Sequence, residues 1–128
     1  FKKMAFNFDA AAGINYIVDI TEDNGNRISI SSLHDGTKFS MDSTYTVAIN
    51  SYRASGGGDL LKLGAGIDPQ TELEGITLGV YPEVRNLIDE YFKNNPEGSI
   101  KYYSNWKFGP DNIAIQAIKR DRKLLFQD

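Results

Sequence analysis

Residues 50–59 read Asn-Ser-Tyr-Arg-Ala-Ser-Gly-Gly-Gly-Asp and directly follow a strongly β-prone run, Tyr-Thr-Val-Ala-Ile, at residues 45–49. Three consecutive glycines after an expected strand are unusual, because glycine loses more backbone entropy on folding than any other residue. They are favoured where the chain must adopt a positive φ, or where a ligand approaches the backbone closely. Tyr52 adds a flat aromatic face before the glycines, and Asp59 adds a hydrogen-bond acceptor after them. The stretch therefore suits a planar ligand with hydroxyl groups, such as a nucleoside.

Alternating patterns around this stretch predict strands, because successive side chains of a strand point to opposite faces. The strands are expected at residues 14–21, 27–33, 38–41, 44–50 and 99–106. A turn is expected at residues 22–26, where Asn24-Gly25 offers the pair of positive-φ residues that tight hairpins prefer. A second turn is expected at residues 34–37.

Helical spacing is clearest at residues 81–95, where Pro82 fits the first helical position. One face of this helix is apolar and predicts a core contact through Val84, Leu87, Ile88, Tyr91 and Phe92. A short helical turn is expected from Asp59, and a closing amphipathic helix from Pro110 to about Leu125. Early strands, one helix, another strand and a closing helix predict an α+β fold with mixed β-sheets packed against helices.

The composition is that of an ordinary globular protein, with 128 residues, 41% hydrophobic and 24% charged. This length predicts a single domain over residues 1–128. A net charge of −3 and a pI near 5.1 argue against a nucleic-acid polymer as partner. The basic run at residues 119–123, interrupted by Asp121, is interpreted as a solvated helix end. The chain has no cysteine, which excludes disulfides, and no apolar run of the roughly 20 residues that a transmembrane helix needs.

The Gly-rich stretch and the strand before it resemble the signature of the C-terminal domain of the 5′-nucleotidase family. This family includes UDP-sugar hydrolases and 2′,3′-cyclic-nucleotide phosphodiesterases, and its motif has a Tyr-x-Val strand, Asn, an aromatic residue, small residues, Gly-Gly and an acidic residue. Further similar elements are Ala12-Gly13-Ile14 leading into residues 16–19, Asn26-Arg27-Ile28, and Asp35-Gly36 followed by Met41-Asp42. The resemblance covers about residues 8–105 and implies a layered α+β C-terminal domain.

The chain departs from this family pattern at the glycines. Family members commonly have two glycines before the acidic residue, whereas three precede Asp59 here. Gly58 thus stands where the usual carboxylate would be. Either Asp59 shifts inward to replace it, or the ribose contact is lost.

The resemblance implies a nucleotide-recognition domain that holds base and ribose during nucleotide catabolism. The substrate-binding residues it implies are Asn50, Tyr52, Gly56, Gly57, Gly58 and Asp59. In the family, a separate N-terminal metallophosphatase domain carries the divalent metals, the catalytic Asn-His pair, the phosphate-binding arginines and a second stacking aromatic. The expected partners are therefore a nucleotide or nucleoside and a metallophosphatase domain, in cis or in trans. The resemblance also implies export to the periplasm or cell surface.

The sequence itself offers no catalytic or metal-binding constellation, and we expect the chain alone to be inactive and to hold no cofactor. Two-metal hydrolysis needs several carboxylate and imidazole ligands around ions about 3.5–4 Å apart. His34 is the single histidine, and it lies in an expected turn facing solvent. The chain begins with Phe, so we expect that its natural N-terminus has been removed or that it is a fragment, and the resemblance favours a fragment. The alternative is a stand-alone nucleoside-binding or scaffolding module that acts with a separately encoded metallophosphatase.

Several of these residues also have plain structural interpretations. Tyr52 stacks on a nucleobase in one interpretation and packs under the glycine loop in the other. Asn50 is expected to bond the loop backbone rather than the ligand. Asp59 caps the following helix or contacts ribose. Arg53 is interpreted as a surface residue in preference to a phosphate ligand, and Trp106 as part of the core.

Overall fold

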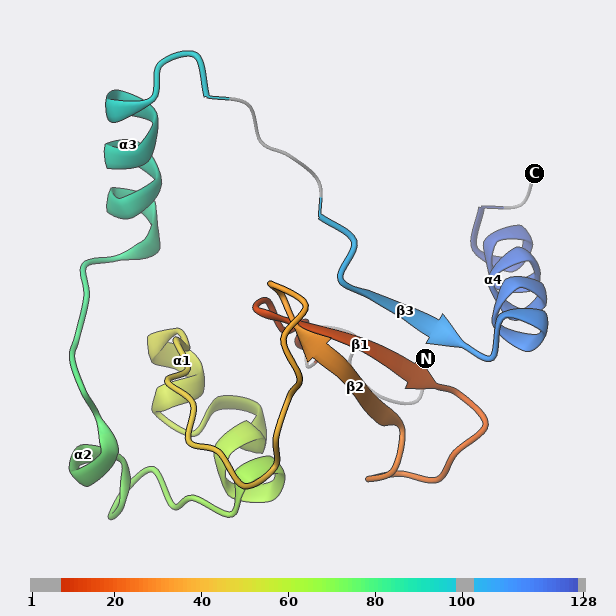
Figure 1. Cartoon of the computed structure of the whole chain (residues 1–128), viewed down its shortest axis with the longest axis horizontal. Coiled ribbons are helices and arrows are strands. Elements are labelled where there is room, and N and C mark those ends of the chain that lie inside the picture. The colour runs from red at the N-terminus through yellow and green to blue at the C-terminus, as the bar shows by residue number, and fades with distance from the viewer. Residues whose placement is uncertain (1–7, 99–102, 127–128) are drawn as a thin grey trace. The chain divides into compact units, whose positions relative to one another are not determined.

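The computed structural model describes residues 8–98 and 103–126 (Figure 1). In chain order its elements are β1 (Ile14–Asp19), β2 (Ile28–Leu33), α1 (Ser51–Ala54), the 3₁₀ turn η2 (Gly57–Asp59), the π-helical turn η3 (Leu60–Ala65), α2 (Leu73–Ile76), α3 (Val84–Asn94), β3 (Trp106–Gly109) and α4 (Asp111–Phe126). The described residues form two compact units. We call residues 8–43 with 103–126 the sheet unit, and residues 44–98 the loop unit. The α+β class expected from the sequence is confirmed.

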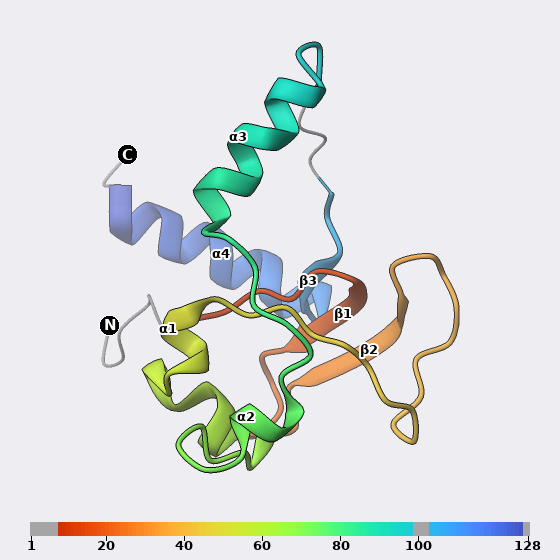
Figure 2. The same cartoon turned by 90° about the vertical axis from the view of Figure 1, so that its left-hand side faces the viewer.

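The sheet unit is built on a mixed three-stranded sheet of order β2-β1-β3 (Figure 1 and Figure 2). β1 pairs antiparallel with β2 and parallel with β3. The register of the parallel pair sets Tyr16 beside Trp106 and Val18 beside Phe108. Because side chains alternate along a strand, these four point to one face of the sheet.

That face carries the core of the sheet unit. Tyr16 and Val18 are buried, and the Tyr16 ring is stacked with the Trp106 ring at a centroid distance of 6.0 Å. Phe8 adds a third ring, 5.5 Å from Trp106. Ala114 of α4 is also buried. Trp106 therefore belongs to the core cluster, as expected, although its side chain is only half-buried.

The turn between β1 and β2 differs from the tight hairpin that Asn24-Gly25 suggested. Only Gly25 of this pair has a positive φ, of 97°. Residues 20–27 connect the strands, and a connection of this length does not need the two consecutive positive-φ residues of a two-residue turn. The side chain of Arg27 stabilises the turn instead, because its Nε donates to the Glu22 carbonyl at 2.7 Å.

Two expected strands do not form, at residues 38–41 and 44–50. The side chains of Tyr45, Val47 and Ile49 have high β-propensity, but that propensity describes how well a side chain fits a sheet. A strand also needs a neighbour that takes its backbone hydrogen bonds, and within the described part of the chain the sheet holds only β1, β2 and β3. The last expected strand is displaced: β3 begins at Trp106, and residues 99–102 lie outside the described residues.

The two long helices had different outcomes. α4 is confirmed almost as expected. α3 begins at Val84 after Glu83, so the prediction that Pro82 occupies the first helical position is wrong. The expected core face of α3 is also wrong, because its five apolar side chains remain 38–62% exposed. Amphipathic spacing indicates which side of a helix could be buried, but it does not supply a neighbouring element.

The helices of the described residues were compared with the requirements of a transmembrane helix. No helix within residues 8–98 and 103–126 combines the length and the apolar character needed to cross a bilayer.

Two turns at strand ends share an Asp-x-Thr pattern. The Asp19 carboxylate accepts hydrogen bonds from the Thr21 hydroxyl at 2.6 Å and the Thr21 N–H at 2.9 Å. The Asp35 carboxylate accepts the same pair from Thr37, at 2.7 and 2.9 Å. The hydroxyl and then the backbone N–H favour the ionised carboxylate, so both lower the pKa of Asp19 and of Asp35.

We expect these two turns to lose their stabilising effect in acid. Because the folded pKa of each Asp is lower than its unfolded value of about 3.9, the stabilisation is present above that value and is lost as the pH falls through the folded pKa. Thr37→Val removes the hydroxyl donor and should raise the pKa of Asp35 toward its ordinary value. An NMR titration of the carboxyl carbons measures this, with Thr46→Val as control. An unchanged Asp35 pKa in Thr37→Val would contradict the assignment.

Candidate functional site

The Gly-rich stretch folds as a chain of short turns in the loop unit. Asn50 has an extended backbone, with φ −77° and ψ 162°, and precedes α1 as its N-cap. Its Oδ1 accepts a hydrogen bond from the Arg53 N–H at 2.8 Å, which satisfies one of the free donors at the start of the helix. Asn50 therefore has the backbone-bonding role expected from the sequence.

The three glycines are required for different physical reasons. Gly56 and Gly58 adopt left-handed conformations, with φ of 96° and 68°, which residues with a Cβ rarely adopt. Gly57 does not have a positive φ, but a Cβ at this position would lie 2.5 Å from Cζ of Tyr52. The triplet thus combines two sharp backbone turns with one close approach of the backbone to an aromatic ring.

Tyr52 lies partly against this loop and partly in solvent. Its ring approaches Gly57, and Cζ of Arg53 lies 5.2 Å from the ring centroid. The residue nevertheless remains 56% exposed. Tyr52 therefore packs against the glycine loop, as one of its two expected roles requires, while more than half of the residue stays exposed. Stacking of Tyr52 on a nucleobase stays a prediction.

Arg53 was misjudged from the sequence. It was interpreted as a surface residue, but it is only 6% exposed, the one buried charged residue of the described chain. Its Nη1 donates to the Gly57 carbonyl at 2.9 Å, so the guanidinium bridges α1 and the glycine turn. No pattern in the sequence indicated that Arg53 would be buried. A single arginine in a Gly-rich stretch does not reveal whether it turns inward.

Asp59 does not have the helix-capping role that was one of its two expected roles. It precedes η3 at the position of an N-cap, but its side chain makes no capping hydrogen bond. Its backbone is left-handed, with φ 57°, the only non-glycine residue of the described chain with a positive φ. Its side chain is exposed. The capping prediction is therefore wrong, and a contact of this carboxylate with ribose stays a prediction.

The six substrate-binding residues expected from the resemblance all lie within this one segment of the loop unit. Arg53 lies in the same segment, whereas His34 and Trp106 lie in the sheet unit. His34 is exposed, and its ring meets the Tyr103 ring edge-on at 4.4 Å. Across residues 8–98 and 103–126, no group of three or more histidine and carboxylate side chains could hold a metal ion.

We expect the substitution Arg53→Met to make the Gly-rich segment less stable against local opening. Methionine keeps an apolar side chain at this position but lacks the guanidinium. The substitution removes the hydrogen bond to the Gly57 carbonyl, and a hydrogen bond from a charged group contributes about 1.5–3 kcal/mol. Amide hydrogen exchange across residues 54–59 measures the loss as reduced protection.

Arg85→Met is the matched control, because Arg85 is exposed on α3 and its replacement should change stability by less than about 0.5 kcal/mol. Equal protection of residues 54–59 in both variants would show that the Arg53 bridge does not hold this segment.

Comparison with known proteins finds similarity in the region that contains this segment. The family model of the 5′-nucleotidase C-terminal domain matches residues 2–63, which include β1, β2 and the whole Gly-rich stretch. The trifunctional nucleotide phosphoesterase protein YfkN of Bacillus subtilis (strain 168) is 28% identical over 117 residues. The match covers 83% of this chain and 8% of YfkN, so the chain spans only a small part of that relative's length. No solved structure matches the chain. Both comparisons support the resemblance to the 5′-nucleotidase C-terminal domain that the motifs of the sequence indicated.

Proposed function

We propose that this chain is the nucleotide-recognition domain of a 5′-nucleotidase-type phosphohydrolase. In this proposal it holds the base and ribose of a nucleotide, while a metallophosphatase domain attacks the phosphate ester. Divalent metals belong to that other domain, and the complete enzyme works in the periplasm or at the cell surface. The match to the family model and the similarity to YfkN, which is named as a nucleotide phosphoesterase, support this division of labour.

The observation that carries the proposal is the exposed ring of Tyr52 beside the glycine turn. The backbone of Gly57, which has no side chain, lies against the Tyr52 ring, and Arg53 lies close to the same ring. Tyr52 is therefore in contact with the protein while more than half of the residue remains exposed. Stacking of a base on an aromatic side chain contributes about 1–3 kcal/mol in single-stranded nucleic-acid binders. A ring held in this way loses less freedom when a ligand binds, which favours binding.

Asp59 is the candidate for the ribose contact. Gly58 occupies the position of the usual family carboxylate, and the next residue, Asp59, carries an exposed side chain without a capping hydrogen bond. A free carboxylate is an acceptor for ribose hydroxyl groups. The left-handed backbone at Gly58 and Asp59 gives the extra glycine a conformational reason, since it turns the chain just before this carboxylate.

Calorimetric titration of the chain with adenosine and AMP tests the proposal. We expect weak, saturable binding in the millimolar range, about −4 kcal/mol, because the second stacking aromatic lies outside the region of family resemblance. Tyr52→Ala should weaken it about tenfold or more, as expected from the loss of stacking.

Tyr81→Ala is the matched control, since Tyr81 is an exposed tyrosine of the same loop unit outside the Gly-rich stretch. This variant should bind like the unmodified chain. Binding that survives Tyr52→Ala would refute the site. Equal losses in both variants would show a general effect of tyrosine removal.

A mixing experiment tests the division of labour separately. We expect a metallophosphatase domain of the same family to hydrolyse AMP faster when the chain is added, because an oriented substrate reacts faster. The Tyr52→Ala chain should give a smaller gain. Nucleoside binding without any gain in hydrolysis would favour the stand-alone binding module instead, and neither effect would favour a scaffold.

A further inference from the structure

The C-terminal half of α4 is separate from the Gly-rich segment and has its own chemistry. Near the start of α4, Ala114 is buried and Ala117 is half-buried. Every described residue from Ile118 onward is exposed. The helix is therefore anchored at its first turns, and its last nine described residues, 118–126, face solvent within the sheet unit.

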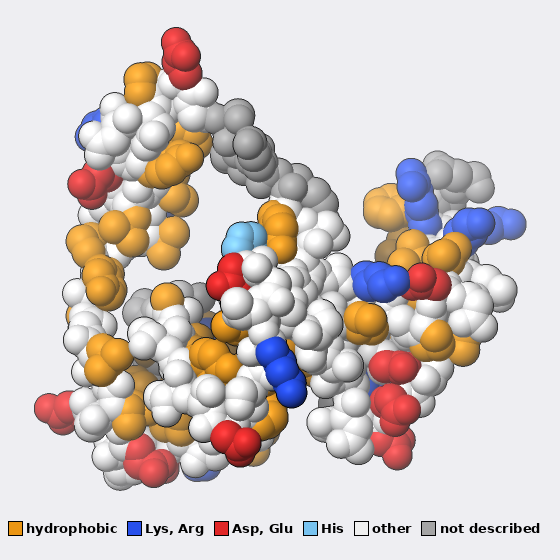
Figure 3. Space-filling model, viewed as in Figure 1, with side chains coloured by type: hydrophobic (Ala, Val, Ile, Leu, Met, Phe, Trp, Pro, Cys, Tyr) orange, Lys and Arg blue, Asp and Glu red, His pale blue; other side chains and the backbone are white. Residues whose placement is uncertain are grey.

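This half of the helix reverses the charge of the chain. Residues 118–126 contain four Lys or Arg residues and one Asp, giving a net charge of +3, whereas the whole chain carries −3. One of the four, Arg120, pairs with Asp121 at 3.2 Å, and that pair is exposed. Figure 3 shows these basic side chains over α4 next to hydrophobic ones. Local positive charge on an acidic chain favours an anionic partner.

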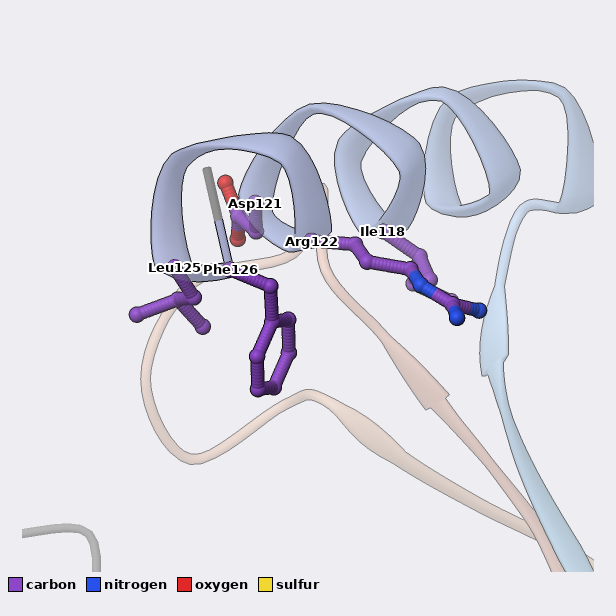
Figure 4. A pocket seen from close by; sticks show the side chains of 5 residues that line it. All are labelled: Ile118, Asp121, Arg122, Leu125 and Phe126. Carbon is purple, nitrogen blue, oxygen red and sulfur yellow. The ribbon is translucent and has the colours of Figure 1, made fainter. Parts of the chain in front are cut away.

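Exposed apolar side chains lie on two sides of α4. Ile115, Ile118, Leu125 and Phe126 are 52–67% exposed and fall on one stripe of the helix, whereas Ile113 and Leu124 lie on the opposite side. The close-up in Figure 4 shows the residues that line a shallow hollow on this side, Ile118, Asp121, Arg122, Leu125 and Phe126. Lys119 and Lys123 follow one step around the helix from the stripe, by the same spacing. A stripe of large apolar side chains bordered by lysines is typical of helices that lie in the plane of a membrane surface.

We propose that α4 binds an anionic lipid bilayer through this face. Leu125 and Phe126 enter the boundary between headgroups and acyl chains, and Lys119 and Lys123 lie at the anionic headgroups. Arg122 stands inside the apolar stripe, and its long stem can lie along the acyl chains while the guanidinium reaches the phosphates. A nucleic acid would use the basic residues but not the exposed apolar stripe, so the bilayer fits the whole face better.

Sedimentation of the full chain with lipid vesicles tests this proposal. We expect binding to vesicles of equal parts phosphatidylglycerol and phosphatidylcholine, and at least tenfold weaker binding to phosphatidylcholine alone. Added salt should weaken the binding, because screening shortens the reach of exposed charges. The charge variant Lys119→Glu with Lys123→Glu should lower the affinity by about tenfold or more, since each basic residue at an anionic surface contributes about fivefold.

Matched controls separate this face from general surface effects. Lys38→Glu with Lys62→Glu makes the same charge change at exposed lysines elsewhere and should leave most of the binding. Leu125→Ser with Phe126→Ser should also lower the affinity by about tenfold or more, whereas Leu78→Ser with Val80→Ser changes two exposed apolar residues of the loop unit and should not. Circular dichroism checks that each variant keeps its helix content.

Three outcomes would overturn the proposal. The first is no binding to anionic vesicles, and the second is equal binding to both vesicle types. The third is binding that is unaffected by the α4 variants. Retention on duplex DNA without vesicle binding would likewise refute the lipid assignment and leave the basic residues as a contact for a polyanion.

Discussion

The parallel pairing of β1 with β3 is the constraint on which the sheet unit depends. It sets Tyr16 beside Trp106, 90 positions apart in the sequence. Closing such a long connection costs conformational entropy, which the contacts at the junction must offset. Side-chain hydrogen bonds strengthen the junction of β1 and β3. The Asn105 amide donates to the Ala11 and Ile14 carbonyls, and the Tyr103 hydroxyl donates to Asn15. The loop unit is the stretch of chain between the two paired segments.

The Gly-rich segment shows a different kind of organisation, in which a short stretch orders itself. Asn50 and Arg53 both bond to backbone groups within seven residues of one another, and the glycines supply conformations that other residues resist. Arg53 is buried and donates a hydrogen bond to the Gly57 carbonyl. A buried charge is costly unless it is hydrogen-bonded, so the position specifies the loop geometry closely. That geometry leaves Tyr52 next to Gly57 and Arg53 while the residue remains 56% exposed.

Much of what could be predicted for the fold came from local patterns. The strands at Ile14–Asp19 and Ile28–Leu33 and the helix Asp111–Phe126 follow from alternation and helical spacing over a few residues. The positions of the candidate site residues in one segment follow from their closeness in sequence, and the family resemblance was recognisable from the same motif. Two of the failures concern segments whose local pattern was not matched by a neighbouring element. Residues 44–50 have strand propensity but do not join the described sheet, and α3 has an apolar face that remains exposed.

The sequence by itself therefore determined the α+β class, the two N-terminal strands, the closing helix, the turn-forming glycines and the family resemblance. Only the tertiary structure decided that β3 pairs with β1, that Arg53 is buried, that Asp59 leaves its helix uncapped and that residues 44–50 do not join the sheet. The physical reason is the distance along the sequence over which each interaction acts. Backbone propensity and amphipathic spacing act over a few residues and can be read along the chain. Burial and strand pairing depend on groups that are distant in sequence, and these are known only once the chain has folded.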